Sequence, residues 1–424
     1  MVAFNLGAAV LFASALGRGA QAAIVRGVNL GGWLVTEPWM TPSLFKATDT
    51  EDEWHLCNEL GKDKCRETLE DHWSTFYTRD DLVAIKRAGL TSVRIPLGYW
   101  AVDLLDYEPY VSGQYPYLVR AVQWANDLGL HVFLDIHGAP GSQNGWEETG
   151  LVGPVDFTAN QTNADRTIKV LRNLTEEFSK DHYGGVVTNI ELLNEPLLSM
   201  DDLKLFYTPA AQVVNVTGIN VTIHDGFYNP HSWANYDPND ESITANTTGN
   251  TEYDQDKRTW FRKLFEAQNA AFTPYGAGQS SIGWYFWSWK LEYDIDAWSY
   301  RRGLSDGYIP SNISDPSTYE FPIKDNGCID TDHAYQAKAT ATFSTYSASA
   351  TSDGSESSSG SGSGSSSDSG SGGDSSSAST TDSSSSSSTS TPGSGAASFS
   401  GKNNALSGLV YLAVAPLAFF SFFL

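Results

Sequence analysis

Basic residues are scarce in this sequence, which holds 26 Lys and Arg against 50 Asp and Glu and has a formal net charge of −24 at pH 7. The phosphates of a nucleic acid would be repelled by such a chain, so nucleic acid is excluded as a partner. There are eight histidines, scattered without H-E-x-x-H or a similar spacing. The sequence therefore predicts no metal site, and it predicts no cofactor.

Cysteine is also rare, with only Cys57, Cys65 and Cys328. Export would take the chain through an oxidising compartment, where pairing is expected. Cys57 and Cys65 are close enough in sequence to pair, which leaves Cys328 as an odd thiol that needs an explanation. Six N-x-Ser/Thr sequons fit a secreted, glycosylated surface. They start at Asn160, Asn173, Asn215, Asn220, Asn246 and Asn312.

The first 22 residues read as a secretory signal. An apolar run extends from Leu6 to Leu16, and Ala20 and Ala22 place small residues at −3 and −1 of a cleavage site before Ala23. The region before that run is weak for a signal, because it has no Lys or Arg near Met1. A short buried helix is the alternative interpretation.

The C-terminal part reads as a stalk followed by an anchor signal. Residues 345–394 are rich in Ser and Gly and offer too little apolar surface to fold, so a disordered stalk is expected. Within 395–424, small residues and a polar spacer precede an apolar tail, the order of a GPI-attachment signal. A tail-anchored single span is the alternative. We expect a secreted protein held at the cell surface or wall by a GPI anchor in the plasma membrane.

Between these ends, residues 23–344 form one domain in which strand and helix patterns alternate. Such alternation predicts a parallel α/β sheet, and polar residues at the carboxyl ends of the strands favour a (β/α)8 barrel. A doubly wound open sheet is the rival, but the sequence has no G-x-G-x-x-G loop after its first strand. Expected strands cover 25–35, 91–100, 131–138, 186–196, 220–227 and 281–289; expected helices cover 80–90 (with Thr78 a possible N-cap), 117–130, 164–184, 201–214 and 257–272.

The stretch "NIELLNEP", 189–196, is the first sign of chemistry. An apolar strand here ends by presenting Asn194 and Glu195 and then stops at Pro196. Glycosidases use a carboxylic acid in such a place as a proton donor, and a partly apolar setting would raise its pKa and keep it protonated. Asn194 could donate a hydrogen bond to a sugar 2-hydroxyl. A plain turn closed by proline is the alternative.

The chain resembles the exo-β-1,3-glucanases of fungal cell walls, in glycoside hydrolase family five, from about Val25 to Gly307. Six long motifs carry the resemblance in order: "RGVNLGGWLVTEPWMTPSLF", "SVRIPLGYWA", "DIHGAPGSQNGWEETG", "IELLNEP", "IHDGF" and "WYFWSWKLE". The resemblance implies a (β/α)8 TIM barrel and a retaining mechanism that releases glucose from β-1,3-glucan.

The resemblance also implies roles for the matching positions. Glu195 is expected to be the acid/base, Arg94 to orient the nucleophile, and Glu37 to hold the terminal glucose. Taken alone, Arg94 could be a structural ion-pair partner and His137 a core histidine. The remaining substrate-binding candidates are Asn194 beside the acid, His137 for sugar hydroxyls, Trp146 at the cleft entrance, and Trp287 as a stacking floor with Trp289 as its alternative.

One part of the family pattern is missing, because no Gly-Glu-Trp-Ser-like motif supplies the nucleophile. Only 53 residues separate Phe227 from Ser281, where two further strand–helix units are due. We expect an internal segment of about 60–80 residues, two or more such units, to be absent between residues 228 and 280. In the family the counterpart of Cys328 pairs inside that segment. A wrongly joined gene model and a natural variant are both possible origins.

Two classes of function follow. The first is a monomeric glucan exo-1,3-β-glucosidase of cell-wall remodelling, impaired or inactive as written because its nucleophile is missing. The second is a non-catalytic GPI-anchored protein that binds glucan or has a structural role in the wall. Within the enzyme class, β-1,6-glucan and short β-1,4 oligomers remain rival substrates.

Overall fold

The computed structural model describes residues 24–224, 253–273, 281–294, 297–324, 329–330 and 332–335. The expected leader, stalk and anchor signal lie outside these ranges, as do Cys328 and the sequon at Asn246. Within the described part, no helix combines the length and the apolar character needed to cross a membrane.

Six strands form one parallel sheet. They are β1 (Val25–Asn29), β2 (Ser92–Gly98), β3 (His131–Gly138), β4 (Val187–Glu191), β5 (Asn220–Thr222) and β6 (Gly283–Phe286). Their order across the sheet is β5-β4-β3-β2-β1-β6. A doubly wound sheet reverses its order at a switch point, whereas this order runs one way and then pairs the first strand with the last. It is the order of a (β/α)8 barrel.

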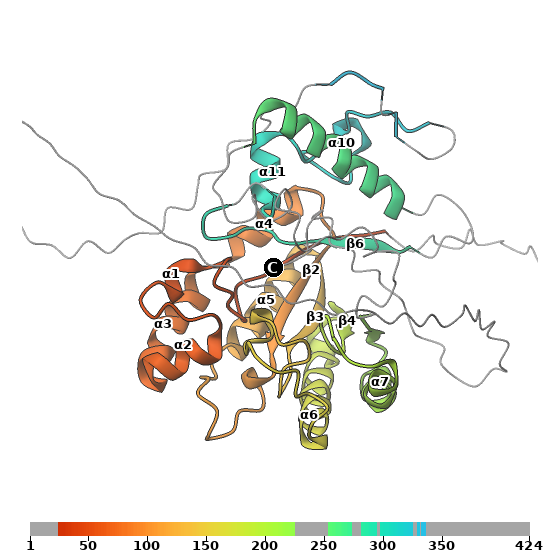
Figure 1. Cartoon of the computed structure of the whole chain (residues 1–424). Coiled ribbons are helices and arrows are strands. Elements are labelled where there is room, and N and C mark those ends of the chain that lie inside the picture. The colour runs from red at the N-terminus through yellow and green to blue at the C-terminus, as the bar shows by residue number, and fades with distance from the viewer. Residues whose placement is uncertain are drawn as a thin grey trace, which may run out of the picture. The chain divides into compact units, whose positions relative to one another are not determined.

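The helices follow the strands as barrel crossovers require. They are α1 (Pro42–Phe45), α2 (Glu53–Leu60), α3 (Lys62–Thr75), α4 (Arg79–Arg87), α5 (Tyr115–Leu128), α6 (Gln161–Phe178), α7 (Met200–Asn215), α10 (Gln255–Phe272) and α11 (Tyr300–Asp306). In Figure 1, α5, α6 and α7 lie on one side of β2, β3 and β4, and α5 contacts β3 while α6 contacts β4. Between β5 and β6 the described residues hold α10 and no further strand.

The cap of α4 ties this helix to the segment after β6. Thr78 and Asp81 form a capping box, which confirms the predicted N-cap. The Asp81 carboxylate also accepts hydrogen bonds from Nζ of Lys290 at 2.9 Å and from Nε1 of Trp289 at 3.1 Å. One buried carboxylate therefore holds both the helix start and the chain that leaves the last strand.

The contact between β1 and β6 depends on a glycine. Gly283 has φ of 146°, and a Cβ there would lie 1.9 Å from the carbonyl oxygen of Val25. The amide of Asn29 extends the junction by donating to the carbonyl oxygen of Phe286 at 3.0 Å. Only glycine lets the two strands approach so closely at this point.

Several elements differ from the sequence prediction. The strands expected over 25–35 and 186–196 stop at Asn29 and Glu191, and those expected over 220–227 and 281–289 are shorter, ending at Thr222 and Phe286. Helices α2 and α3 were not predicted from their polar sequence. They are nonetheless well defined, because Asp52 caps α2 and a disulfide joins Cys57 to Cys65, as the spacing of these cysteines indicated.

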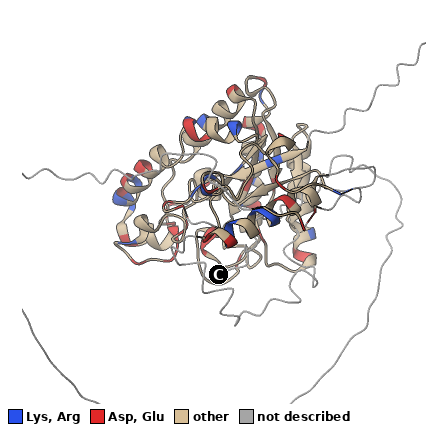
Figure 2. Ribbon diagram, turned by 90° about the horizontal axis from the view of Figure 1, so that it is seen from above, with Lys and Arg blue, Asp and Glu red and all other residues tan. Residues whose placement is uncertain are grey.

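The helices carry charged residues of both signs. In the ribbon of Figure 2, acidic and basic residues are both spread along the helices.

Candidate active site

Arg94 on β2 is the centre of a buried polar network. Its side chain is 2% exposed and lies among β2, β3 and β4. Nε donates to Oε2 of Glu191 at 3.0 Å, and Nη2 lies 3.0 Å from Oδ2 of Asp135. Burial alone would lower the pKa of Arg94, but these two carboxylates raise it, so the guanidinium stays charged.

Glu191 and Asp135 are site residues that sequence reasoning missed. Both are fully buried, and they are register partners on neighbouring strands. Burial raises the pKa of Glu191 to about 8, with Asp135 adding to the rise and Arg94 opposing it. The signal available in the sequence was an acidic residue inside each of two apolar strands, where the side chains alternate between the faces.

Asn194 and Glu195 lie in the loop after β4, three and four residues beyond the end of the strand at Glu191. The Oδ1 atom of Asn194 accepts from Nη2 of Arg94 at 2.8 Å, and its main-chain N–H donates to the carbonyl oxygen of Ile136 at 2.9 Å. Glu195 has φ of 42°, in the left-handed region that few residues other than glycine adopt. Such backbone strain is found at functional sites when the surroundings hold it in place.

The electrostatic surroundings of Glu195 suit a proton donor. Burial is the largest cause that raises its pKa to about 7, and the Asp135 and Glu147 carboxylates raise it further, while Arg94 opposes the shift. A carboxyl group with this pKa holds its proton at the mildly acidic pH at which general acids work.

The loop after β3 packs against the same residues. Gln143 donates from Nε2 to the carbonyl oxygen of Asn194 at 3.0 Å, and Asn144 donates to the carbonyl oxygen of Glu195 at 3.1 Å. The Asn144 amide also reaches Oε1 of Glu148 at 2.6 Å. Trp146, the predicted entrance aromatic, lies in this loop with its side chain half-buried.

Glu37 lies in the loop after β1 and is 3% exposed. Oε2 accepts from Nε1 of Trp39 at 2.8 Å, while the buried Oε1 has no hydrogen-bond partner among the described residues. Burial raises the pKa of Glu37 to about 8, and the charges of Glu147 and Glu195 add to this, while the Trp39 hydrogen bond opposes it. An orphaned buried oxygen in a polar site is suited to a ligand hydroxyl.

His137 and Trp287 face each other across β3 and the end of β6. Their rings stack with centroids 5.4 Å apart and planes 6° apart. Nδ1 of His137 lies 2.6 Å from Oδ2 of Asp135, so this nitrogen carries the proton. Burial lowers the pKa of His137 and keeps the ring neutral, which makes Nε2 an acceptor without a partner among the described residues.

Trp289, the alternative stacking residue, is fully buried and packs against Tyr300. Its indole N–H is already used by Asp81. Trp287 is half-buried, so of the two tryptophans it is the one with surface free to contact a ligand.

The structure brings no second catalytic carboxylate to Glu195 from the described part of 228–280. Glu266 on α10 is buried, pairs with Arg262 at 2.5 Å and accepts from the main-chain N–H of Phe321 at 2.9 Å. Asp254 caps α10 by accepting from the N–H of Lys257 at 2.8 Å. Both carboxylates therefore serve the packing and start of α10. Four other carboxylates of this segment, Asp237, Asp240, Glu241 and Glu252, lie outside the described residues.

One group of side chains could in principle hold a cation. Ligand atoms of Glu51, Asp52 and His55 lie within 4.8 Å of one another. Asp52 is already engaged, because Oδ1 accepts from the N–H of His55 at 2.7 Å and Oδ2 accepts from the N–H of Val152 at 2.7 Å. This group lies at the start of α2, where Asp52 both caps the helix and binds the loop after β3.

Comparison with known proteins places this chain in a family. The family model described as cellulase (glycosyl hydrolase family 5) matches residues 57–251. A glucan 1,3-beta-glucosidase of Pichia angusta is 33% identical over 378 residues, covering 69% of this chain and 87% of the relative. One of Lachancea kluyveri is 46% identical over 226 residues, covering 50% of this chain and 51% of the relative.

Solved structures also resemble this chain. A rutinosidase from Aspergillus niger matches with a TM-score of 0.48 and 22% identity, over 62% of this chain and 79% of that one. The Pichia angusta relative carries the assignment, because it is 33% identical to this chain and the match covers 87% of its length. This chain belongs to glycosyl hydrolase family 5, where its relatives are fungal glucan 1,3-beta-glucosidases.

Proposed function

We propose that the intact protein is a retaining exo-glycosidase that releases glucose from β-1,3-glucan, with Glu195 as its acid/base. One observation carries this proposal. Glu195, a carboxyl group with a pKa of about 7, lies in the loop just after β4, beside an asparagine that Arg94 holds in place. The names of the relatives support β-1,3-glucan as the substrate, with β-1,6-glucan and short β-1,4 oligomers as rivals.

The other predicted residues would bind the terminal glucose. Oε1 of Glu37 and Nε2 of His137 are buried acceptors without protein partners in the described residues, so each can take a sugar hydroxyl. Trp287 offers an aromatic face to the apolar side of a pyranose ring. The Nδ2 group of Asn194 can donate to the sugar 2-hydroxyl, because its Oδ1 is occupied by Arg94.

The first chemical step would use Glu195 as a general acid. As the glycosidic bond breaks, its proton passes to the leaving oxygen, and the carboxylate that remains can later activate water. A retaining mechanism also needs a nucleophilic carboxylate about 5–5.5 Å away. We propose that the segment carrying it is missing, so that the chain as written has little or no activity.

The alignments support a missing internal segment. Since 69% of 424 residues is about 293 residues, roughly 85 of the 378 positions aligned with the Pichia angusta relative have no counterpart in this chain. The strand order leaves room for two units between β5 and β6. A wrongly joined gene model is our preferred origin, and a natural variant is the alternative.

Two measurements test this proposal together. The transcript should be sequenced across codons 230–255, and the purified chain should be assayed for glucose release from laminarin. We expect an additional segment in the transcript and no glucose from the chain as written. A transcript that reads straight through, with active protein, would contradict both the missing segment and the missing nucleophile.

The expected location is the cell surface, through export and a GPI anchor. The composition of 1–22 and 395–424 supports it. Phosphatidylinositol-specific phospholipase should release the protein from intact cells. Detection of residues 405–424 in the mature, membrane-bound protein would contradict the anchor.

A non-catalytic wall protein is the second candidate. The observation that favours it is the combination of a well-formed sugar site with no nucleophile in the described residues. Binding of laminari-oligosaccharides without hydrolysis, from a transcript that encodes this chain as written, would support this candidate over the enzyme.

A further inference from the structure

Glu53, the first residue of α2, is a buried carboxylate outside the acid/base machinery. It is 0% exposed. Oε2 accepts from both the main-chain N–H and the hydroxyl of Thr36 at 3.0 Å, and Oε1 accepts from Nε1 of Trp100 at 2.8 Å. Thr36 immediately precedes Glu37, so Glu53 fixes the backbone that presents the sugar-binding carboxyl group.

All three partners of Glu53 are donors, so both of its oxygens are needed as acceptors. Burying such a group is costly, and burial raises its pKa to about 7 in spite of these bonds. An apolar side chain would avoid that cost but would leave the donors of Thr36 and Trp100 without a partner.

The same helix end also holds the loop after β3. Oδ2 of Asp52 accepts from the N–H of Val152 at 2.7 Å. The N–H of Trp54 donates to the carbonyl oxygen of Gly150 at 2.9 Å. This loop includes Trp146 and Glu148, and Glu148 shares the amide of Asn144 with the main chain of Glu195.

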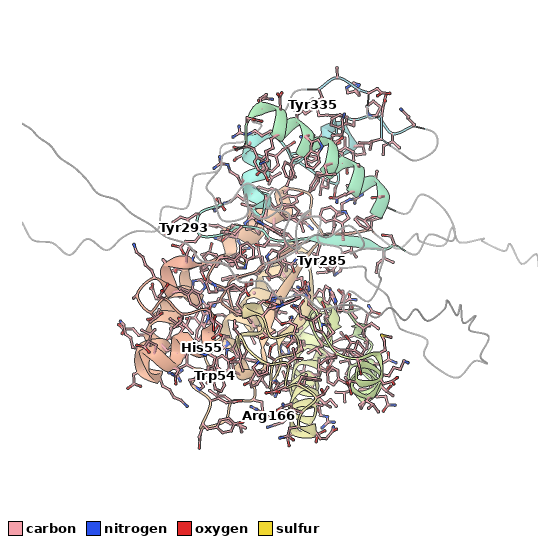
Figure 3. The ribbon with its side chains drawn as sticks, viewed as in Figure 1. Trp54, His55, Arg166, Tyr285, Tyr293 and Tyr335 are labelled. Carbon is pink, nitrogen blue, oxygen red and sulfur yellow. A yellow bond between two sulfur atoms is a disulfide. The ribbon has the colours of Figure 1, made fainter. Side chains whose placement is uncertain are left out.

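Helix α2 is itself firmly braced. The disulfide between Cys57 and Cys65 joins it to α3. From α3, Nε2 of His72 lies 2.8 Å from the carbonyl oxygen of Gly32, in the loop that leads to Thr36. Figure 3 labels Trp54 and His55 in the first turn of α2.

We propose that Glu53 and Asp52 are positioning residues. They fix the loops after β1 and β3 relative to each other, so that Glu37 and the 146–148 segment contact the same sugar. Glu53 controls the first loop through Thr36, and Asp52 controls the second through Val152. The loop-ordering part stands on contacts within the protein, whereas its consequence for sugar binding rests on the proposed function.

Glu53→Gln is the main test because it keeps the shape and replaces one acceptor oxygen with a donor. Hydrogen–deuterium exchange would report on the amides of Thr36 and Val152, which donate directly to Glu53 and Asp52. We expect Glu53→Gln to speed exchange at Thr36 at least tenfold while Val152 stays protected, and Asp52→Asn to do the reverse. Glu59→Gln, an exposed site on the same helix, is the matched control and should change neither.

Laminaribiose affinity, measured by titration calorimetry, is the second readout. We expect Glu53→Gln to weaken this affinity about tenfold. Amide exchange outside the two loops should change little. Thr36→Val removes only the hydroxyl contact and should cause a smaller effect of the same kind, so it provides the test if Glu53→Gln does not fold.

The outcomes separate the two proposals. Unchanged exchange at Thr36 in both Glu53→Gln and Thr36→Val would overturn the positioning role. Uniformly faster exchange over the whole protein would also overturn it, because that pattern indicates general destabilisation. Exchange at Thr36 could change in Glu53→Gln while the wild-type protein fails to bind laminaribiose. That result would support the positioning role and contradict the proposed function.

Discussion

The Nη2 atom of Arg94 lies 2.8 Å from the Oδ1 atom of Asn194, although the two residues are 100 positions apart. Arginine can only donate, so the oxygen of the asparagine amide must face it. The NH2 group of Asn194 is thereby turned away from Arg94 and left to serve as a donor. An amide in the loop after β4 thus takes a fixed direction from a side chain on β2, two strands away in the sheet.

Asn194→Asp tests the use of that donor. Aspartate keeps an oxygen for Arg94 and loses the NH2 group. The sugar complex would then lose a hydrogen bond worth about 1–1.5 kcal/mol, so the dissociation constant should rise close to tenfold. Calorimetric titration with laminaribiose measures it. Equal affinity in wild type and variant would argue against a role for this amide in sugar binding.

Glu195→Gln tests the acid/base in the intact, segment-containing product. The change keeps the shape and removes the ionisable proton, so turnover on laminarin should fall by about 10²–10⁴-fold. Glu176→Gln on the exposed side of α6 is the matched control and should keep full turnover. Near-normal glucose release by the Glu195→Gln enzyme would show that another group donates the proton.

The raised pKa of Glu37 predicts a pH-dependent stability difference. Between pH 4.5 and pH 8 the unfolded chain loses this proton while the folded protein keeps it, because burial raises the pKa from 4.5 to about 8. Folding is therefore penalised increasingly as pH rises, by up to about 1.4 kcal/mol per pH unit. Glu37→Gln removes this penalty, so its stability relative to wild type should increase over that range.

Urea unfolding of both proteins at pH 5, 6, 7 and 8 would measure this difference. Glu59→Gln, an exposed site on α2, is the control, and its difference from wild type should stay constant. A constant difference for Glu37→Gln as well would mean that Glu37 is ionised in the folded protein throughout.

A second buried ion cluster predicts a large loss of stability. Arg166 on α6, labelled in Figure 3, donates to Oδ2 of Asp103 at 2.6 Å and to Oε1 of Glu108 at 2.8 Å, and all three are buried. Arg166→Met would remove the cation that two buried carboxylates share, leaving Glu108 without its ion-pair partner and Asp103 with Lys169 alone, at a cost of about 3–5 kcal/mol in unfolding free energy.

The matched control for Arg166 is Lys169, which pairs with the same Asp103 but is 68% exposed. Lys169→Met should cost less than about 1 kcal/mol. Urea unfolding of the two variants side by side checks the contrast. Similar losses for both would indicate that the cluster is more hydrated than its burial suggests.

The parts of the fold that could be predicted are those whose sequence has a strong period or a stop signal. The strand over 131–138 was predicted with its true bounds, and the helices over 117–130 and 257–272 were within two residues of theirs. Helices α2 and α3 were missed because their apolar residues are few. Their stability comes from the Asp52 cap and the disulfide, which a search for apolar faces does not detect.

The site divides in a similar way. Glu195 and His137 could be singled out because each is a polar residue that interrupts or follows an apolar run. Glu191 and Asp135 lie within the runs, and their partner Arg94 lies on another strand, so only the register of the sheet reveals them. Glu53 gave no signal at all, because in sequence it resembles the exposed acid of a helix start.

The pairing of β1 with β6 affects how the protein can be made. The side-chain amide of Asn29 on β1 donates to the carbonyl oxygen of Phe286 on β6, 257 positions later. Because β1 is synthesised first, it cannot form this contact until β6 has left the ribosome. At typical synthesis rates this delay is on the order of 10–50 s. During it one edge of β1 is unpaired and open to other chains. Such distant contacts raise the contact order and slow folding, so a nascent chain that lacks β6 should depend on chaperones.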